Sequence, residues 1–287
     1  MKRPAILMAL LAFVSMSFAL SVLAQDASKD QKKDQKSDAQ AATTPAPAPG
    51  KHRPEAKTQP EFDAYSAAIV SATPEAMEKA AEDFATKFPA SEIKILLYKR
   101  AMQLYQLANN ADKTIDLGRK CLTLDGDDPE ALVDVAQSLA ERTRDTDLDK
   151  EQKYAEAQKD AEKALQTVDT DLIVNAGTTQ DKIDQYKSYL RSTAYGSLGI
   201  IYYSKDTKDD YGKAEDYLRK SIAALPSQPD LVTMLRLSIA LDKQGKYTDA
   251  LTEVNKLVEM TKEGTPVGDP ARREQSRLQT LTKDLIK

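Results

Sequence analysis

The chain has 287 residues, and its 41 lysines and arginines against 45 aspartates and glutamates give a net charge of −4. This mildly acidic, well-mixed balance argues against nucleic acid as a partner. The single cysteine, Cys121, cannot form a disulfide within the chain and is expected to be a buried small apolar residue rather than a reactive thiol. The single histidine, His52, excludes sites built on several histidines. We therefore expect a non-catalytic protein without cofactors.

The N-terminus, residues 1–24, has the pattern of a secretory signal peptide. Lys2 and Arg3 precede a nearly unbroken apolar stretch over residues 5–20, and small residues follow it. This pattern predicts cleavage before Gln25 and export to the periplasm or the medium. Cleavage would lower the net charge to about −6 and leave no stable membrane insertion. An uncleaved membrane anchor is the alternative, although the apolar run is shorter than the roughly 20 residues of a spanning helix.

Residues 25–60 are low in complexity. They are rich in Asp, Lys, Gln, Ala and Pro, they contain no aromatic residue, and a Pro/Ala run occupies residues 43–50. Such a segment cannot bury enough apolar surface to offset the entropy of ordering. The composition predicts a disordered tether.

From Glu61 onward apolar residues recur at three- and four-residue spacing, which predicts helices. No segment has the alternation of a strand. The breaks between periodic segments define five helix pairs and a last helix. The predicted pairs are Glu61–Ser71 with Pro74–Lys87, Ser91–Ala108 with Ala111–Leu124, Pro129–Arg142 with Lys150–Val168, Gln180–Ser204 with Tyr211–Leu225, and Asp230–Gln244 with Tyr247–Lys262, followed by Pro270–Ile286.

Local signals support these breaks. A proline near a helix start loses no hydrogen bond, and a preceding Thr or Asp can cap the free backbone N–H groups. A glycine between two helices allows a chain reversal with positive φ. The proline starts are Pro74, Pro129 and Pro270, the predicted caps are Thr73, Asp128 and Asp269, and the turn glycine is Gly245.

The last pair shows why the helices must stack. Each of its helices carries one apolar face, so a pair alone would leave half of that surface in water. Neighbouring pairs must cover it, and a final helix must cover the open end. The two faces consist of Met234, Leu237 and Leu241 and of Ala250, Val254 and Leu257, and the stripe of the final helix consists of Leu278, Leu281 and Leu285.

One sequence pattern recurs in these pairs. The fourth pair carries Tyr195, Leu198, Gly199, Tyr202, Ala214, Leu218 and Pro226, and the third carries Leu132, Val135, Ala136, Leu139, Ala157, Ala161 and Ala164. Ile95 and Pro129 open two successive units 34 residues apart. The pattern and period resemble the tetratricopeptide repeat, whose signature is Trp-x2-Leu-Gly-x2-Tyr, Ala-x3-Phe and Pro.

The resemblance implies an all-α, right-handed α-solenoid of about five helix pairs over residues 61–268, with a capping helix over 269–287. It also implies a non-catalytic scaffold or adaptor for protein or peptide partners in the cell envelope, with a role in envelope assembly. In this family the first helix of each pair lines the binding groove. The matching positions here are Lys99, Gln103, Gln106, Val133, Gln137, Gly196, Ile200, Tyr203, Leu235 and Ile239.

The predicted groove is polar in its early part and apolar in its late part, which favours an apolar peptide or helix face there. The alternative is that neighbouring parts of the chain cover this surface.

A second candidate site lies between the helices of the third pair. Asp145, Asp147, Asp149 and Glu156 have the spacing of positions 1, 3, 5 and 12 in a calcium-binding loop. Lys150 stands at the sixth position, where such loops carry glycine. The residues therefore suggest either a solvated acidic insertion or, as the alternative function, a calcium-responsive binding module.

Overall fold

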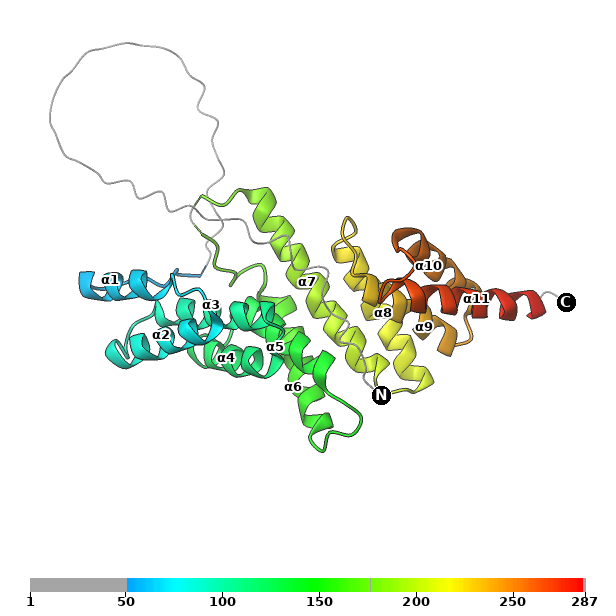
Figure 1. Cartoon of the computed structure of the whole chain (residues 1–287), viewed down its shortest axis with the longest axis horizontal. Helices are drawn as coiled ribbons and strands as arrows, with labels where there is room; N and C mark the ends of the chain where they lie inside the picture. Colours follow the sequence, from blue (N-terminus) through cyan, green and yellow to red (C-terminus); the bar gives the residue numbers. More distant parts are fainter. Residues whose placement is uncertain (1–50, 176, 286–287) are drawn as a thin grey trace, which may run out of the picture. The chain divides into compact units, whose positions relative to one another are not determined.

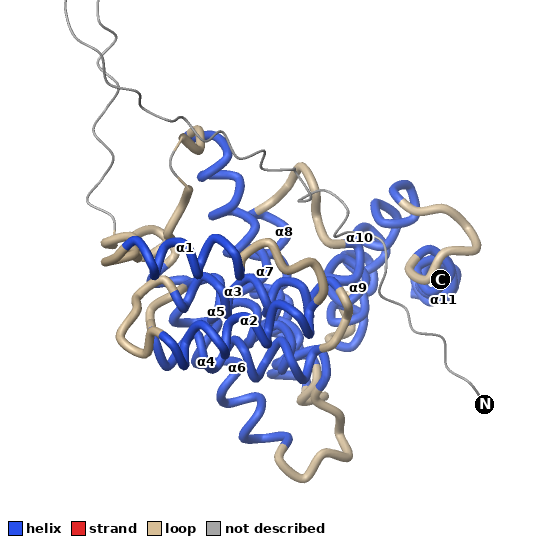
Figure 2. The backbone as a smooth tube through the Cα atoms, turned by 60° about the vertical axis from the view of Figure 1, so that its left-hand side comes forward, coloured by secondary structure: helices blue, strands red, loops and turns tan. Residues whose placement is uncertain are grey.

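The computed structural model of the chain describes residues 51–175 and 177–285, so the predicted signal peptide and residues 25–50 of the predicted tether lie outside the described residues. In the described part all regular secondary structure is helical (Figure 2). The helices are α1 Gln59–Ala68, α2 Pro74–Lys87, α3 Lys94–Leu107, α4 Ala111–Leu124, α5 Pro129–Arg142, α6 Lys150–Thr167, α7 Gln180–Tyr203, α8 Lys208–Ala224, α9 Leu231–Lys243, α10 Tyr247–Met260 and α11 Gly268–Leu285.

The prediction of an all-α, solenoid-like stack is confirmed. From α1 to α11 each helix contacts the next one along the chain, and α5 also contacts α7 (Figure 1). All predicted helices are present, with ends within three residues of the predicted ones. Buried apolar side chains form clusters that follow the chain, from one around α2 and α3 to one that joins α8, α9, α10 and α11. A core spread along successive helix pairs is the property of a repeat stack.

Capping residues explain most helix starts. Thr73 and Asp128 accept hydrogen bonds from backbone N–H groups in the first turns of α2 and α5, as predicted. The N-cap hydroxyl of Thr207 accepts from the backbone N–H of Asp210 at 3.2 Å, so α8 begins before the predicted Tyr211. Gly245 has φ of +80° in the turn between α9 and α10, also as predicted.

The start of α11 differs from the prediction. Asp269 lies inside the first turn instead of preceding it, because the helix already begins at Gly268. The hydroxyl oxygen of Thr265 accepts from the Gly268 backbone N–H at 3.0 Å, and the Asp269 carboxylate accepts from the Gly264 N–H at 2.7 Å. Asp269 therefore holds the preceding turn, and Thr265 takes the capping role that the sequence assigned to Asp269.

Glycine allows the closest approach between α7 and α8. A Cβ atom at Gly199 would lie 2.6 Å from Leu218 Cδ2 and 2.8 Å from its Cγ. Leu218 is fully buried, so it has little room to move. By contrast, a Cβ atom at Gly212, on α8, would meet only the end of the Gln244 side chain at 3.8 Å.

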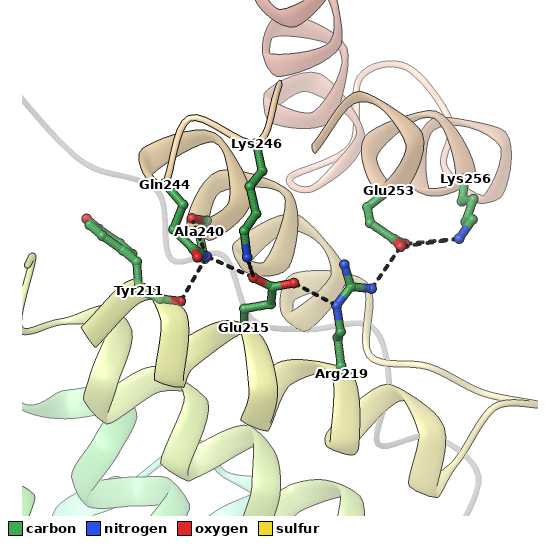
Figure 3. Close-up of polar contacts among 8 residues, drawn as sticks. All are labelled: Tyr211, Glu215, Arg219, Ala240, Gln244, Lys246, Glu253 and Lys256. Atoms are coloured by element: carbon green, nitrogen blue, oxygen red, sulfur yellow. Dashed lines mark hydrogen bonds and ion pairs between the residues drawn. The ribbon is translucent and has the colours of Figure 1, made fainter. Parts of the chain in front are cut away.

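A charged network joins α8 to the last helix pair (Figure 3). The Glu215 carboxylate accepts hydrogen bonds from Lys246 at 2.6 Å, from Gln244 at 3.0 Å and from Arg219 at 3.0 Å. Arg219 also donates to Glu253 of α10 at 3.2 Å. The side chain of Glu215 is only 13% exposed, so its bonds are shielded better than those of a surface pair. This network fixes the junction between the fourth and fifth pairs.

Residues 51–58, here called the N-terminal strap, lie at the end of the predicted tether and have no helical structure. The ammonium group of Lys51 pairs with Asp125, before α5, and lies 3.4 Å from Asp171, before α7. Arg53 donates to the side chain of Asn175 at 3.1 Å. The strap therefore contacts the loops that precede α5 and α7, which are distant from it in sequence.

Candidate functional site

The first helices of successive pairs, α3, α5, α7 and α9, form the surface here called the first-helix face. On α5 this face carries Glu130, Asp134, Gln137 and Glu141, here called the acidic stripe. Their spacing of four, three and four residues places them in one row along the helix. The other sides of α5 carry the buried apolar residues that anchor the helix in the stack.

One end of the acidic stripe is neutralised by a buried lysine. The Lys99 ammonium of α3 pairs with Asp128, the cap of α5, at 2.7 Å and with Glu130. The Lys99 side chain is only 9% exposed. Burial alone would lower the pKa of Lys99, but the charges of Glu130 and Asp128 outweigh it and raise the pKa. The hydroxyl of Tyr186, on α7, also donates to Glu130 at 2.5 Å, so this cluster links three first helices.

Asp134, one turn further along α5, has no such cation. It is 8% exposed, and its Oδ1 accepts a hydrogen bond from the Gln106 amide of α3 at 3.0 Å. Its other oxygen, Oδ2, accepts no hydrogen bond from the described residues and keeps some contact with solvent. Burial, together with the negative charge of Glu130, raises the pKa of the Asp134 carboxyl from 3.8 to about 7.

Two tyrosines of α7 lie beside Asp134. The rings of Tyr186 and Tyr189 stack with centroids 6.1 Å apart and an angle of 10° between their planes. Both rings are half-buried. Burial raises the pKa of Tyr189 to about 12, and the nearby charge of Asp134 adds to this effect. The phenol groups therefore remain protonated at neutral pH and can donate hydrogen bonds.

Glu141 closes the stripe at the end of α5. Its carboxylate accepts from the Gln137 amide at 3.2 Å, and the side chain is exposed. Surrounding protein nevertheless raises the pKa of Glu141, because it displaces part of the water around the carboxylate. The nearby charge of Arg236, on α9, opposes this shift, but the two side chains form no ion pair within the described part of the chain.

Only some of the predicted groove residues lie at the acidic stripe. Gln106 and Gln137 contact Asp134 and Glu141, and Gln103, also on α3, is half-buried. Lys99 lies in the buried cluster instead of projecting from the face.

Two predicted groove positions are corrected because they lie in the core. Val133 is fully buried in a cluster with Leu190 and Ala194, so it does not line a groove. Ile200 is 7% exposed and packs in another core cluster.

The predicted groove residues of α7 and α9 do not lie at the acidic stripe. Gly196 is buried, with Ser221 and Thr233 beside its backbone. Tyr203 packs edge-on against Tyr211, with ring centroids 5.6 Å apart. Leu235 packs against the C-terminal core cluster, whereas Ile239 lines a shallow depression of about 490 Å³ between α9 and α11. These residues therefore belong to separate environments.

Each residue of the predicted calcium loop has a cationic neighbour. Asp145 pairs with Lys150 at 2.8 Å and Asp147 with Lys153 at 3.0 Å, and Asp149 also pairs with Lys153. Among the described residues no three carboxylate, histidine or cysteine side chains are grouped as metal ligands would be. Glu156 reaches across to α4, where it accepts two hydrogen bonds from Arg119 at 2.7 Å.

Cys121 is fully buried, as predicted, and burial raises the pKa of its thiol. His52 lies on the N-terminal strap, 3.5 Å from Glu92. Sequence reasoning missed Asp134, Glu141 and the two tyrosines. A usable signal existed, since Asp134 interrupts the apolar run from Ala131 to Ala136.

No protein-family model matches this chain, and no curated protein matches it either. None of the helices between residues 51 and 285 combines the length and the apolar character needed to cross a membrane.

Proposed function

We propose that this chain is an exported scaffold or adaptor related to tetratricopeptide-repeat proteins, and that it binds a polypeptide segment on its first-helix face. The observation that carries the proposal is the acidic stripe. Asp134 accepts a hydrogen bond from Gln106 of α3, Gln137 donates one to Glu141, and both Asp134 Oδ2 and the half-buried Gln137 keep contact with solvent. A row of fixed polar groups on successive helices suits an extended or helical peptide.

The repeat pattern and the signal-like N-terminus support the remaining parts of the proposal. The signature residues Gly199 and Leu218 pack against each other at the α7–α8 contact, as a tetratricopeptide-like pair requires. The signal-like pattern of residues 1–24 supports export, and a protein in the cell envelope would meet its partners there. N-terminal sequencing of the protein recovered from a periplasmic or medium fraction tests this part, with Gln25 as the expected first residue.

Site-specific crosslinking tests the binding face. A photoreactive amino acid replaces Gln137 on the acidic stripe in one variant and Gln152, an exposed residue of α6, in another. We expect a discrete polypeptide adduct from position 137, competed by unmodified protein, and none from position 152. Equal labelling at both positions, or at neither, would contradict a specific role for this face.

A further inference from the structure

The acidic stripe contains two carboxylates without a cationic partner. Lys99 neutralises Asp128 and Glu130 at one end of α5, but neither Asp134 nor Glu141 has a lysine or arginine within ion-pair distance among the described residues. Other partly buried carboxylates, such as Glu215, do have one. Asp160, on α6, is also buried without an ion pair among the described residues, whereas the stripe carries two carboxylates without an ion pair in one row on α5.

The lack of a cationic partner is less expected for Asp134 than for Glu141. A carboxylate that is more than nine-tenths buried normally pairs with a cation or becomes neutral. Here one oxygen accepts from Gln106, while Oδ2 accepts from none of the described residues and still meets solvent. The free oxygen therefore marks a place where a donor or a cation can arrive from outside.

The neighbouring tyrosines fit the same kind of ligand. The charges of Asp134 and Glu141 both add to the raised pKa of Tyr189, so the phenol lies within electrostatic reach of the two carboxylates. Its ring stacks on Tyr186. A lysine ammonium or arginine guanidinium near a tyrosine ring gains cation–π attraction, and a phenol can donate to a carboxylate beside it.

The spacing of the carboxylates indicates the form of the ligand. Asp134 and Glu141 are seven residues apart on one helix, which corresponds to about 10 Å at 1.5 Å per residue. A single metal ion binds oxygen ligands at about 2.3–2.6 Å and cannot bridge that distance. In a peptide with the polyproline II conformation, residues three positions apart share a face and are separated by about 9 Å, close to this spacing.

We propose that the first-helix face binds a basic polypeptide segment in which two lysines or arginines, about three positions apart, pair with Asp134 and Glu141. This inference rests on the proposed function and adds the chemistry of the partner. The positive charge of Arg236, on α9, acts on Glu141, so a further basic residue close to Glu141 would meet a like charge.

Titration calorimetry with the purified chain tests the inference. The probe is an extended peptide of alanine and serine that carries two lysines three positions apart. The comparison peptide has glutamates in place of the lysines. We expect binding of the basic peptide alone, and we expect it to weaken as salt is added, because ion pairs are screened. Binding of both peptides alike, or of neither, would overturn the inference.

Variants locate the peptide. Asp134→Asn keeps the Oδ1 acceptor for Gln106 and should weaken binding by at least about tenfold, and Glu141→Gln by about threefold because it is more exposed. Asp83→Asn, at an exposed carboxylate on α2, is the matched control and should leave affinity unchanged. Circular dichroism confirms that each variant is folded. Unchanged affinity in Asp134→Asn would refute the assigned site.

The two proposals can fail separately. If the crosslink at position 137 persists in the Asp134→Asn, Glu141→Gln double variant, the face binds a polypeptide but does not recognise basic residues. If the crosslink at position 137 is also absent when Asp134 and Glu141 are unchanged, the proposed function itself fails.

Discussion

Asp134→Asn is expected to make the protein more stable, and increasingly so as the pH rises. The buried Asp134 carboxyl has a pKa of about 7 against an ordinary value of 3.8. An acid with a raised pKa binds its proton more tightly in the folded chain than in the unfolded one. Its contribution to stability is therefore full below about pH 4 and declines as the pH rises to about 7. Asparagine does not ionise and avoids that decline.

The size of the effect follows from the shift. A difference of about three pKa units corresponds to about 4 kcal/mol in the free energy of unfolding once the pH exceeds both values. Relaxation around the charge would reduce this, so we expect Asp134→Asn to stabilise by about 2–4 kcal/mol at pH 8 and by less than about 1 kcal/mol at pH 4.

Urea unfolding at the two pH values measures this difference. Asp83→Asn serves as the control, since its carboxylate is exposed and should show little difference between pH 4 and pH 8. A gain from Asp134→Asn that is the same at both pH values would refute the assignment of the raised pKa to this carboxyl. Destabilisation at pH 8 would show that an ion pair stabilises the charge. If Asp134→Asn is more stable but no longer binds the peptide, the Asp134 carboxylate serves binding and lowers stability.

Three further predictions concern packing, charge and reactivity. Gly199→Ala should lower the free energy of unfolding by about 1–3 kcal/mol, because the added Cβ would overlap α8. Gly212→Ala should raise it by up to about 1 kcal/mol through helix propensity. Thermal unfolding measures both variants, and an increase in stability for both would refute the close contact at Gly199. Lys99→Ala should lower the free energy of unfolding by about 3–5 kcal/mol, since it leaves two carboxylates buried without a cation. Lys79→Ala, at an exposed lysine, should change it by less than about 0.5 kcal/mol. Urea unfolding measures both differences. Cys121 should react with a thiol reagent only in denaturant, and rapid labelling of the native chain would contradict its burial.

The helices could be predicted from the sequence because their signals are local. Apolar periodicity, proline starts and capping residues placed α2, α4 and α5 with the ends that the structure has. Where prediction and structure differ, the cause is a distant contact at α3 and a local cap at α8 and α11. Ser91 was expected to start a helix, but its hydroxyl donates to Glu61, and α3 begins at Lys94. At α8 and α11 the hydroxyls of Thr207 and Thr265 accept from backbone N–H groups three residues further on.

The binding face could be predicted only in part, because it depends on how each helix is rotated. One residue changes the direction of a side chain by about 100° around a helix. Choosing Val133 instead of Asp134 was an error of one residue, yet it exchanged a core residue for a candidate ligand-binding one. Lys99 was placed on the correct helix, but its partners Asp128 and Glu130 lie in the next pair. Repeat register alone does not specify such contacts between pairs.

The N-terminal strap determines where a mechanical load would enter the stack. Lys51 joins the loops before α5 and α7, through Asp125 and Asp171, although α1 is the first helix along the chain. Tension on the chain ahead of residue 51 therefore reaches the middle pairs first and leaves α1 and α2 outside the direct path. Those middle pairs carry the acidic stripe, so force on the N-terminal side would act beside the face assigned to the partner.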